Sequence, residues 1–237
     1  MKLYAQILFA IVGLFTINAQ ASIVLGGTRI IYPSNKSEVQ MPIKNKDDNN
    51  KYLVQSWVTN VDGVKAPFII TPPIYKMEAN SQALLHIVFS GDKAALPQDR
   101  ESLFVANVKS VSAMPAELKD KNTLQFAMKV QLKLFWRPSN LKEVDALSAW
   151  EDLQFSRQSS QLIAKNSTPF YISLLDITVG GKPVTPISND SIPSAVSMMI
   201  PPFGEQHFSI PAGATGKVSW SAVNDYGAAT GKKQQQL

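Results

Sequence analysis

Hydrophobic and polar residues alternate in short runs along most of the chain, and Pro, Gly, Asn and Asp separate the runs at regular intervals. Alternation with a period of two is typical of strands that bury one face. Before residue 138 this pattern predicts seven strands, in the runs IVLGGTRIIY, EVQMPI, YLVQSWVTN, FIITPPIYKM, ALLHIVFS, SLFVANVKSV and LQFAMKVQLKLFWRP. Seven strands with turns of this kind favour one β-sandwich of the immunoglobulin type.

The pattern changes after Pro138, where the stretch SNLKEVDALSAWEDL predicts either a turn of helix or a linker. We place a domain boundary near residues 138 to 145, which gives domains at 22–140 and 141–237. Alternating runs resume as QLIAKN, PFYISLLDITV, SAVSMMIPPF, HFSI and KVSWSAV, and they predict a second, smaller sandwich. The predicted fold class is therefore all-β. The polar tail GKKQQQL is predicted to be frayed.

The first 21 residues have the pattern of a secretory signal peptide. Lys2 precedes the apolar stretch ILFAIVGLFTI, and the small residues of Ala19-Gln20-Ala21 fit a cleavage site. The apolar stretch is 11 residues long, whereas a membrane-spanning helix needs roughly 20. We therefore expect an exported protein whose mature chain begins at Ser22.

Composition narrows the possible functions. The chain of 237 residues has no cysteine, which excludes disulfides, thiol catalysis and cysteine-ligated metals. Its 23 basic and 18 acidic residues give a formal charge of +5, but the basic residues are scattered and form no block. A scattered excess of this size indicates a solvated surface, so we expect no nucleic-acid partner.

Few residues offer catalytic chemistry. The two histidines, His86 and His207, lie in strand-like runs, where the side chain is more often exposed or satisfied than catalytic. The sequence contains no zinc-protease, nucleophile-elbow or phosphate-loop motif. A carboxylate pair of the glycosidase kind stays open, because the positions of the 18 acids in space are unknown. We expect no enzyme activity, no cofactor and no metal.

A weaker interpretation is a secreted two-domain sandwich that binds carbohydrate through exposed aromatic side chains. The candidates are the four tryptophans, Trp57, Trp136, Trp150 and Trp220. Tryptophans in this number are ordinary in protein cores, which is why we prefer other readings.

The last run before Pro138 is unusual in length and pattern. Its even positions are apolar and share one face: Leu124, Phe126, Met128, Val130, Leu132 and Leu134. This row either fills the core of its own domain or extends beyond the sheet to meet another chain. A run of 15 residues exceeds the usual strand length of about five or six, which favours an overhanging part. Such a strand can add to the open sheet of a partner.

A strand that adds to another sheet needs a fixed register, because a slip by one residue turns the apolar row outward. Arg29 and Lys133 are two cations that could converge on a carboxylate through charge-assisted hydrogen bonds. The alternative for both is an ordinary ion pair at the surface or between the domains. Lys133 is at an odd position, so its side chain points to the opposite face of the strand from the apolar row. Both can meet one partner only if the strand twists or bulges, or if the partner's end enters the angle between the domains.

Several motifs together resemble those of the PapD-like periplasmic chaperones of the pilus chaperone–usher pathway. They are GGTRIIY, YLVQSWV, TPPIYKMEAN, LPQDRESLFVANV, VQLKLFWRP, NSTPFYIS and NDYGA, and they span nearly all of the mature chain. The resemblance implies two immunoglobulin-like domains in an L-shaped, boomerang arrangement in the periplasm of a Gram-negative cell. It also implies pilus subunits and an outer-membrane usher as partners. In donor-strand complementation, the chaperone completes a subunit that lacks its last strand, and at the usher the next subunit replaces it.

The resemblance further implies roles for individual residues. Arg29 and Lys133 would bind the C-terminal carboxylate of a subunit. The donor strand would contain Leu124, Phe126, Met128 and Val130. An interdomain salt bridge that fixes the angle between the domains would contain Glu101, Arg137 and Asp225.

Three further points concern the subclass of the chain, its lack of a disulfide and its self-association. The short segment 112–122 implies the subclass with a short loop before the last strand of the first domain, the F1–G1 loop, which serves rod-forming pili more often than thin fibres. The chain departs from relatives that carry a disulfide in the second domain. An exposed strand edge also predicts weak self-association of the free chaperone.

Overall fold

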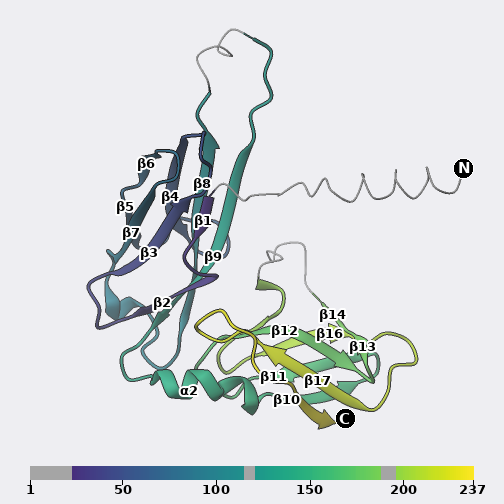
Figure 1. The fold of residues 1–237 in the computed structure, drawn as a ribbon. Coiled ribbons are helices and arrows are strands. Elements are labelled where there is room, and N and C mark those ends of the chain that lie inside the picture. Colours follow the sequence, from purple (N-terminus) through teal and green to yellow (C-terminus); the bar gives the residue numbers. More distant parts are fainter. Residues whose placement is uncertain (1–22, 115–120, 188–195) are drawn as a thin grey trace, which may run out of the picture.

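The computed structural model describes residues 23–114, 121–187 and 196–237, and the predicted signal peptide, residues 1–21, lies outside this part. Two β-sandwiches follow one another along the chain and stand at an angle, like the two arms of a letter L (Figure 1). The predicted class, all-β with two immunoglobulin-like sandwiches in an L-shaped arrangement, is confirmed. Within the described residues, no helix has the length and apolar character needed to cross a bilayer.

Two sheets form the first sandwich. The sheet that we call the β3 sheet has the order β1-β3-β7-β5, with bounds Ile23–Leu25, Val39–Asn45, Gln82–Phe89 and Phe68–Thr71. The second, the β9 sheet, has the order β2-β9-β8-β4-β6, with bounds Arg29–Pro33, Ala127–Arg137, Ser102–Ser112, Tyr52–Thr59 and Ile74–Met77. A short 3-10 helix, η1, spans Lys93–Ala95. Inward side chains of both sheets share one core, which includes Ile43, Leu85, Leu134 and Trp136.

The prediction of seven strands in this domain is wrong, because two of the predicted runs are divided between the sheets. The run IVLGGTRIIY forms β1 in the β3 sheet and β2 in the β9 sheet. A Cβ on Gly26 would overlap the ring of Pro42, so a glycine permits the close crossing between them. The run FIITPPIYKM forms β5 and β6 in different sheets, since Pro72 and Pro73 lack the N–H that continues a ladder.

The strand β9 begins at Ala127, later than the predicted start at Leu124. It pairs antiparallel with β8, from Ala127 opposite Val111 to Trp136 opposite Ser102. On its other side β2 pairs in parallel and covers only the part from Lys133 onward. Residues 127–132 of β9 therefore have a free edge, as far as the described strands go. Of the predicted short loop 112–122, residues 115–120 lie outside the description.

The segment between the sandwiches contains a helix, α2 at Glu143–Ser148, and a 3-10 turn, η3 at Ala149–Asp152. In the second sandwich, one sheet has the order β10-β11-β16-β14, with bounds Gln154–Gln158, Gln161–Lys165, Glu205–Ser209 and Thr185–Pro186. The other has the order β13-β12-β17-β18, with bounds Lys182–Pro183, Ile172–Val179, Lys217–Ala222 and Lys233–Gln236, and β15 at Met199–Ile200 pairs with β12. The core between them includes Leu162, Ile177, Phe208 and Trp220.

The prediction of a frayed C-terminal tail is wrong. The tail forms β18 and pairs antiparallel with β17, from Lys217 opposite Gln236 to Trp220 opposite Lys233. The side chain of Gln235 also binds the backbone of Phe155. Its amide nitrogen donates to the Phe155 carbonyl at 2.7 Å, and its amide oxygen accepts the Phe155 N–H at 3.1 Å. The amide of Gln235 thus makes the two hydrogen bonds that the backbone of a neighbouring strand would make. The polar composition of the tail does not reveal this pairing.

Candidate functional site

Two cations lie side by side in the angle between the domains. Arg29 on β2 and Lys133 on β9 are directly paired in the parallel ladder, so their side chains leave the same face of the sheet. The guanidinium of Arg29 donates to the carbonyl of Val223 at 2.8 Å, and the Lys133 ammonium donates to the Ser173 hydroxyl at 3.4 Å. Both acceptors belong to the second domain, so the cations face it.

A hollow of about 280 Å³ opens beside these cations. Its lining consists of Thr28, Arg29, Val105, Gln131, Leu132, Lys133, Val196, Val223 and Gly227. In the described part of the chain, no carboxylate lies within salt-bridge distance of Arg29 or Lys133, and the buried Nε of Arg29 has no hydrogen-bond partner. A buried donor without an acceptor is unfavourable. The hollow therefore suits an anion that accepts hydrogen bonds.

The protonation of the two cations reflects their burial. Burial, together with the nearby charge of Arg29, lowers the pKa of Lys133 to about 8. Burial also lowers the pKa of Arg29, against the opposing charges of Asp225 and Glu101. Two like charges with reduced solvation stand together without an anion between them. A bound carboxylate would raise both pKa values.

The apolar row of β9 has two different environments along its length. Leu132 and Leu134 are buried in the core of the first domain, and Val130 is half-buried. Toward the start of the row the exposure rises, to 48% for Met128, 77% for Phe126 and 81% for Leu124. The later part of the row therefore fills the core of its own domain, and the earlier part stays exposed; a contact of the exposed part with another chain stays a prediction. The exposed part adjoins the free edge at residues 127–132.

Arg137, near the end of β9, connects the two domains. Its guanidinium lies 2.7 Å from Glu101 Oε1 and 2.7 Å from Asp225 Oδ2. The other oxygen of Glu101 accepts the backbone N–H of Tyr171 at 2.8 Å. The structure thus brings together the three residues predicted for an interdomain salt bridge: Glu101 and Arg137 come from the first domain and Asp225 from the second.

Burial governs the electrostatics of this network. Burial raises the pKa of Glu101, against the opposing charge of Arg137. Burial by itself lowers the pKa of Arg137, but the hydrogen bonds and charges of Asp225 and Glu101 outweigh it, so the pKa rises. The guanidinium therefore stays charged inside the interface.

Sequence reasoning found one residue, Asp225, of a loop that makes several interdomain contacts. In this loop, residues 223–229, Val223 accepts the Arg29 hydrogen bond across the interface, and within the second domain Tyr226 donates to Glu143 of α2 at 2.6 Å. Gly227 has φ +81° and lies so near Thr28 that a Cβ would overlap the threonine hydroxyl. The glycine in NDYGA signals a turn, but a turn signal does not say which surface it faces.

Cation and ring contacts also join the domains, and no motif in the sequence indicated them. The ring of Phe135 packs against that of Tyr171, with 5.8 Å between centroids. The Arg100 guanidinium lies 4.8 Å from the ring centroid of Phe203. These contacts add to the network around Arg137 in holding the angle.

The remaining candidate residues lie apart from the cation pair. His86 is bonded to Glu38, and His207 to Glu205, on partly exposed strands. Within the described ranges, no group of three or more His, Asp or Glu could hold a metal ion. The four tryptophans do not share an exposed surface, because Trp136 and Trp220 are buried in separate cores. The carbohydrate-binding alternative is therefore not favoured.

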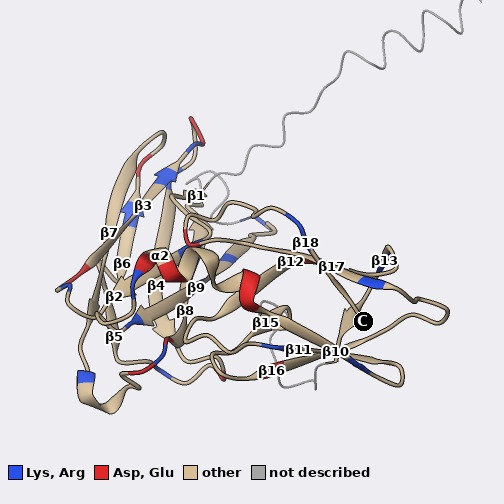
Figure 2. Ribbon diagram, turned by 90° about the horizontal axis from the view of Figure 1, so that it is seen from below, with Lys and Arg blue, Asp and Glu red and all other residues tan. Residues whose placement is uncertain are grey.

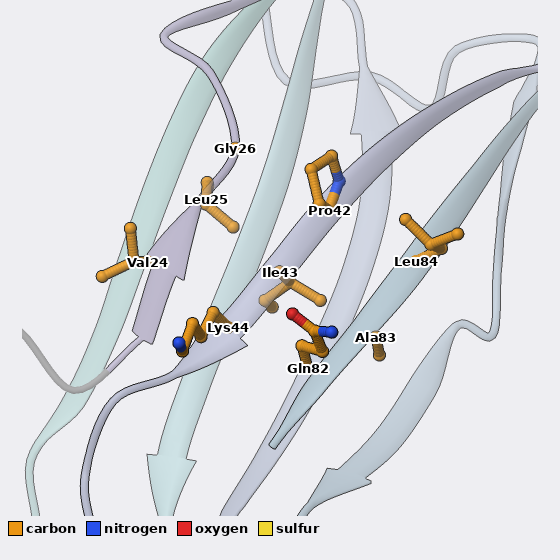
Figure 3. A pocket seen from close by; sticks show the side chains of 9 residues that line it. All are labelled: Val24, Leu25, Gly26, Pro42, Ile43, Lys44, Gln82, Ala83 and Leu84. Carbon is orange, nitrogen blue, oxygen red and sulfur yellow. The ribbon is translucent and has the colours of Figure 1, made fainter. Parts of the chain in front are cut away.

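A separate hollow of about 440 Å³ lies on the β3 sheet. Figure 3 shows the residues of β1, β3 and β7, with Gly26, that line it. Most of its lining side chains are apolar, such as Leu25, Pro42 and Leu84, and Lys44 is the one charged residue among them. It lies on the other sheet from Arg29 and Lys133, so it is not part of the cation site.

Three features define the class of immunoglobulin-like assembly chaperones: two immunoglobulin-like sandwiches set at an angle, paired cations in this angle, and a strand with a free edge and exposed apolar side chains at its start. The chain belongs to the PapD-like family of pilus-assembly chaperones. Residues 22–142 match the family described as "Pili and flagellar-assembly chaperone, PapD N-terminal domain". Residues 148–234 match "Pili assembly chaperone PapD, C-terminal domain". The family predicted from the motifs is thus confirmed.

Individual relatives agree with the family. The chaperone protein FimC of Escherichia coli K12 is 37% identical over 215 residues, which cover 90% of this chain and 84% of FimC. The probable fimbrial chaperone SfmC of the same strain is 36% identical, with 100% and 97% covered. Among solved structures, Salmonella enterica SafA pilin in complex with the SafB chaperone matches with a TM-score of 0.76 and 31% identity, with 92% of this chain and 97% of that chain covered.

Proposed function

We propose that this chaperone binds a pilus subunit by donor-strand complementation in the periplasm of a Gram-negative cell, caps it, and delivers it to an outer-membrane usher. The observation that carries the proposal is the free edge of β9, which adjoins bare apolar side chains on one side and two unpaired cations on the other. Removal of residues 1–21, the domains 22–140 and 141–237, and the short-loop subclass belong to the same proposal. The complex of SafB with a pilin supports a subunit as the partner.

The strands around β9 limit how a partner can enter. β2 occupies the edge of β9 from Lys133 onward, so a strand of another chain can pair only before Lys133, along residues 127–132 and the exposed segment that precedes them. A partner that ends at Arg29 and Lys133 must arrive from the Ala127 side and therefore run parallel to β9, in line with β2. The terminal carboxylate of the partner is a main-chain group at the end of its strand, so it does not point to either face of the sheet as a side chain does. One partner can thus meet both the apolar row and Lys133, although these lie on opposite faces.

The exposed part of the row provides the apolar contact. Burying Leu124, Phe126 and Met128 in a partner contributes about 1.5 to 3 kcal/mol for each side chain, before the cost of association. Main-chain hydrogen bonds along the free edge add affinity and fix the register. Two empty chaperones could pair through the same edge, so weak self-association stays a prediction.

Replacing Phe126 by Asp should abolish subunit capture and leave the chaperone folded. The side chain is 77% exposed, so the free energy of unfolding should change by less than about 0.5 kcal/mol. The carboxylate would be buried unpaired in the partner, which is strongly unfavourable. Capture is measured by native mass spectrometry after co-expression with pilus subunits, and stability by urea unfolding.

The matched variant Leu134→Asp places the same charge at a fully buried position of the same row, and it should unfold the first domain. If Phe126→Asp unfolded the chaperone in the same way, Phe126 would belong to the core, and its place in the donor strand would be wrong.

Subunit affinity should fall as the pH rises through about 8. The empty chaperone then loses the Lys133 proton, whose pKa is lowered to about 8, and only the charged form attracts a carboxylate. The loss should approach about tenfold for each pH unit well above this value, until the pKa of Lys133 in the complex is reached. The folded-state pKa of Lys133 lies below the ordinary lysine value of 10.5, so the charged group destabilises the empty chaperone fully below about pH 8. This destabilisation decreases as the pH rises from about 8 to 10.5.

The measurement is the Kd for a subunit peptide with a free carboxyl terminus from about pH 6 to about pH 10. Lys133→Arg serves as the control, since arginine stays charged over this range and its affinity should be flat. A wild-type Kd that does not change over the range would remove Lys133 from the carboxylate site.

A further inference from the structure

The face of β9 that carries Lys133 continues toward the start of the strand as a row of polar and basic side chains. Lys129 lies on this face, and its direct antiparallel neighbour on β8 is Lys109. Like charges directly opposite each other destabilise a sheet. Neither lysine has an acidic partner among the described residues; Figure 2 colours the basic positions of the chain blue and the acidic ones red. An uncompensated pair of this kind favours an anionic partner.

Neighbouring side chains hold this surface in place. The ammonium of Lys129 lies 5.7 Å from the ring centroid of Trp57 on β4, within the range of a cation–π contact. One row nearer to Lys133, Gln131 donates to the side-chain oxygen of Asn107 at 3.1 Å, and Asn107 donates to Thr59 at 3.3 Å. These hydrogen bonds orient the amides before any partner arrives.

The surface is continuous with the cation pair. A hollow of about 150 Å³ is bordered by Trp57, Lys129 and the amide row. It shares Val105, Gln131 and Val196 with the hollow at Arg29 and Lys133. Val196 belongs to the second domain, so this face of β9 looks into the angle between the domains. A chain that ends at Arg29 and Lys133 would pass along it.

We propose that Lys129, supported by Lys109, selects subunits whose last strand carries acidic side chains on the side turned toward the second domain. The inference rests on the proposed function. In a parallel partner strand, alternate residues face Met128 and Val130 on one side and Lys129 and Gln131 on the other. The first set must be apolar to continue the core. In the second set, Asp or Glu pairs with Lys129, and Lys or Arg is repelled.

The test uses two synthetic peptides that differ only in charge on one face. Each has apolar residues at every second position and a free carboxyl terminus, and two intervening positions carry Glu in one peptide and Lys in the other. The mature wild-type chaperone should bind the Glu peptide roughly tenfold more tightly at low salt. The preference should shrink at about 1 M salt, where the Debye length is about 3 Å.

The variant Lys129→Glu should reverse the order of the two peptides. Lys44→Glu, on the β3 sheet, changes the net charge equally and should leave the wild-type preference intact. Equal affinities of the wild type for both peptides would overturn the inference. If Arg29→Ala/Lys133→Ala then weakened both peptides alike, the proposed function would stand without it. If that double variant bound both peptides as the wild type does, the proposed function and the inference would fall together.

Discussion

The double variant Arg29→Ala/Lys133→Ala should lose subunit binding by a factor of at least about one hundred and still fold. Each cation offers a charge-assisted hydrogen bond to the carboxylate, which contributes about 1.5 to 3 kcal/mol, so the two together contribute roughly 3 to 6 kcal/mol. The free edge and the apolar row remain, but without the anchor the added strand has no fixed register. Removing the half-buried ammonium of Lys133, which has no carboxylate partner among the described residues, should not itself weaken the fold, because its desolvation is unfavourable near neutral pH.

The measurement is native mass spectrometry of the tagged chaperone, co-expressed with the pilus subunits of its own gene cluster and isolated from a periplasm. The wild type should carry one subunit, and the double variant should emerge alone. Lys165→Ala/Lys217→Ala removes two exposed lysines of the second domain and should behave as the wild type. A double variant at Arg29 and Lys133 that still carried a full complement of subunit would show that the carboxylate lies elsewhere.

Replacing Arg137 by Met should lower the free energy of unfolding by about 3 to 5 kcal/mol, because the buried Glu101 then loses its partner. The pKa of Glu101, already raised by burial, should rise further without the guanidinium. A group whose folded pKa is raised contributes stability at low pH that is lost as the pH rises. The defect should therefore be smaller near pH 5 than near pH 8.

Urea unfolding followed by tryptophan fluorescence measures this defect, since Trp136 reports on the first core and Trp220 on the second. Small-angle scattering measures the angle between the domains, which we predict to become more variable in this variant. Arg157→Met is the matched control, because Arg157 binds only backbone carbonyls of the second domain at the surface. If Arg137→Met were as stable as the control at pH 8, the network would not be what holds the domains together.

Period-two alternation predicted most strands and the fold class, because it records which side chains face a core. It failed where the chain changes sheet. At Gly26 and at Pro72 the alternation runs on while the strand ends, since alternation does not say which sheet a strand joins. It also failed at the tail, where the pairing of Gln235 with the backbone of Phe155 depends on a segment 80 residues away.

The candidate site followed from the sequence to a similar extent. The unbroken row from Leu124 to Leu134 reveals that one face is apolar, but not that the core ends near Val130. The ladder does not mark this point either, because β8 pairs with β9 as far as Ala127. The network of Glu101, Arg137 and Asp225 came from motif resemblance and could not come from spacing. The contacts of Val223 and Gly227 with the first domain depend on how the domains dock, which no local pattern encodes.

The parallel strand β2 limits how far along β9 another strand can pair. It fills the edge from Lys133 onward, so in the proposed complex the subunit strand has a fixed length of free edge and would end at Arg29. Residues appended after the natural carboxyl terminus of a subunit would collide with β2 and move the carboxylate away from both cations. A purification tag for a subunit of this chaperone therefore belongs at its amino end. If the proposed site is right, the same geometry would let the chaperone distinguish an intact subunit from one with a shortened or extended terminus.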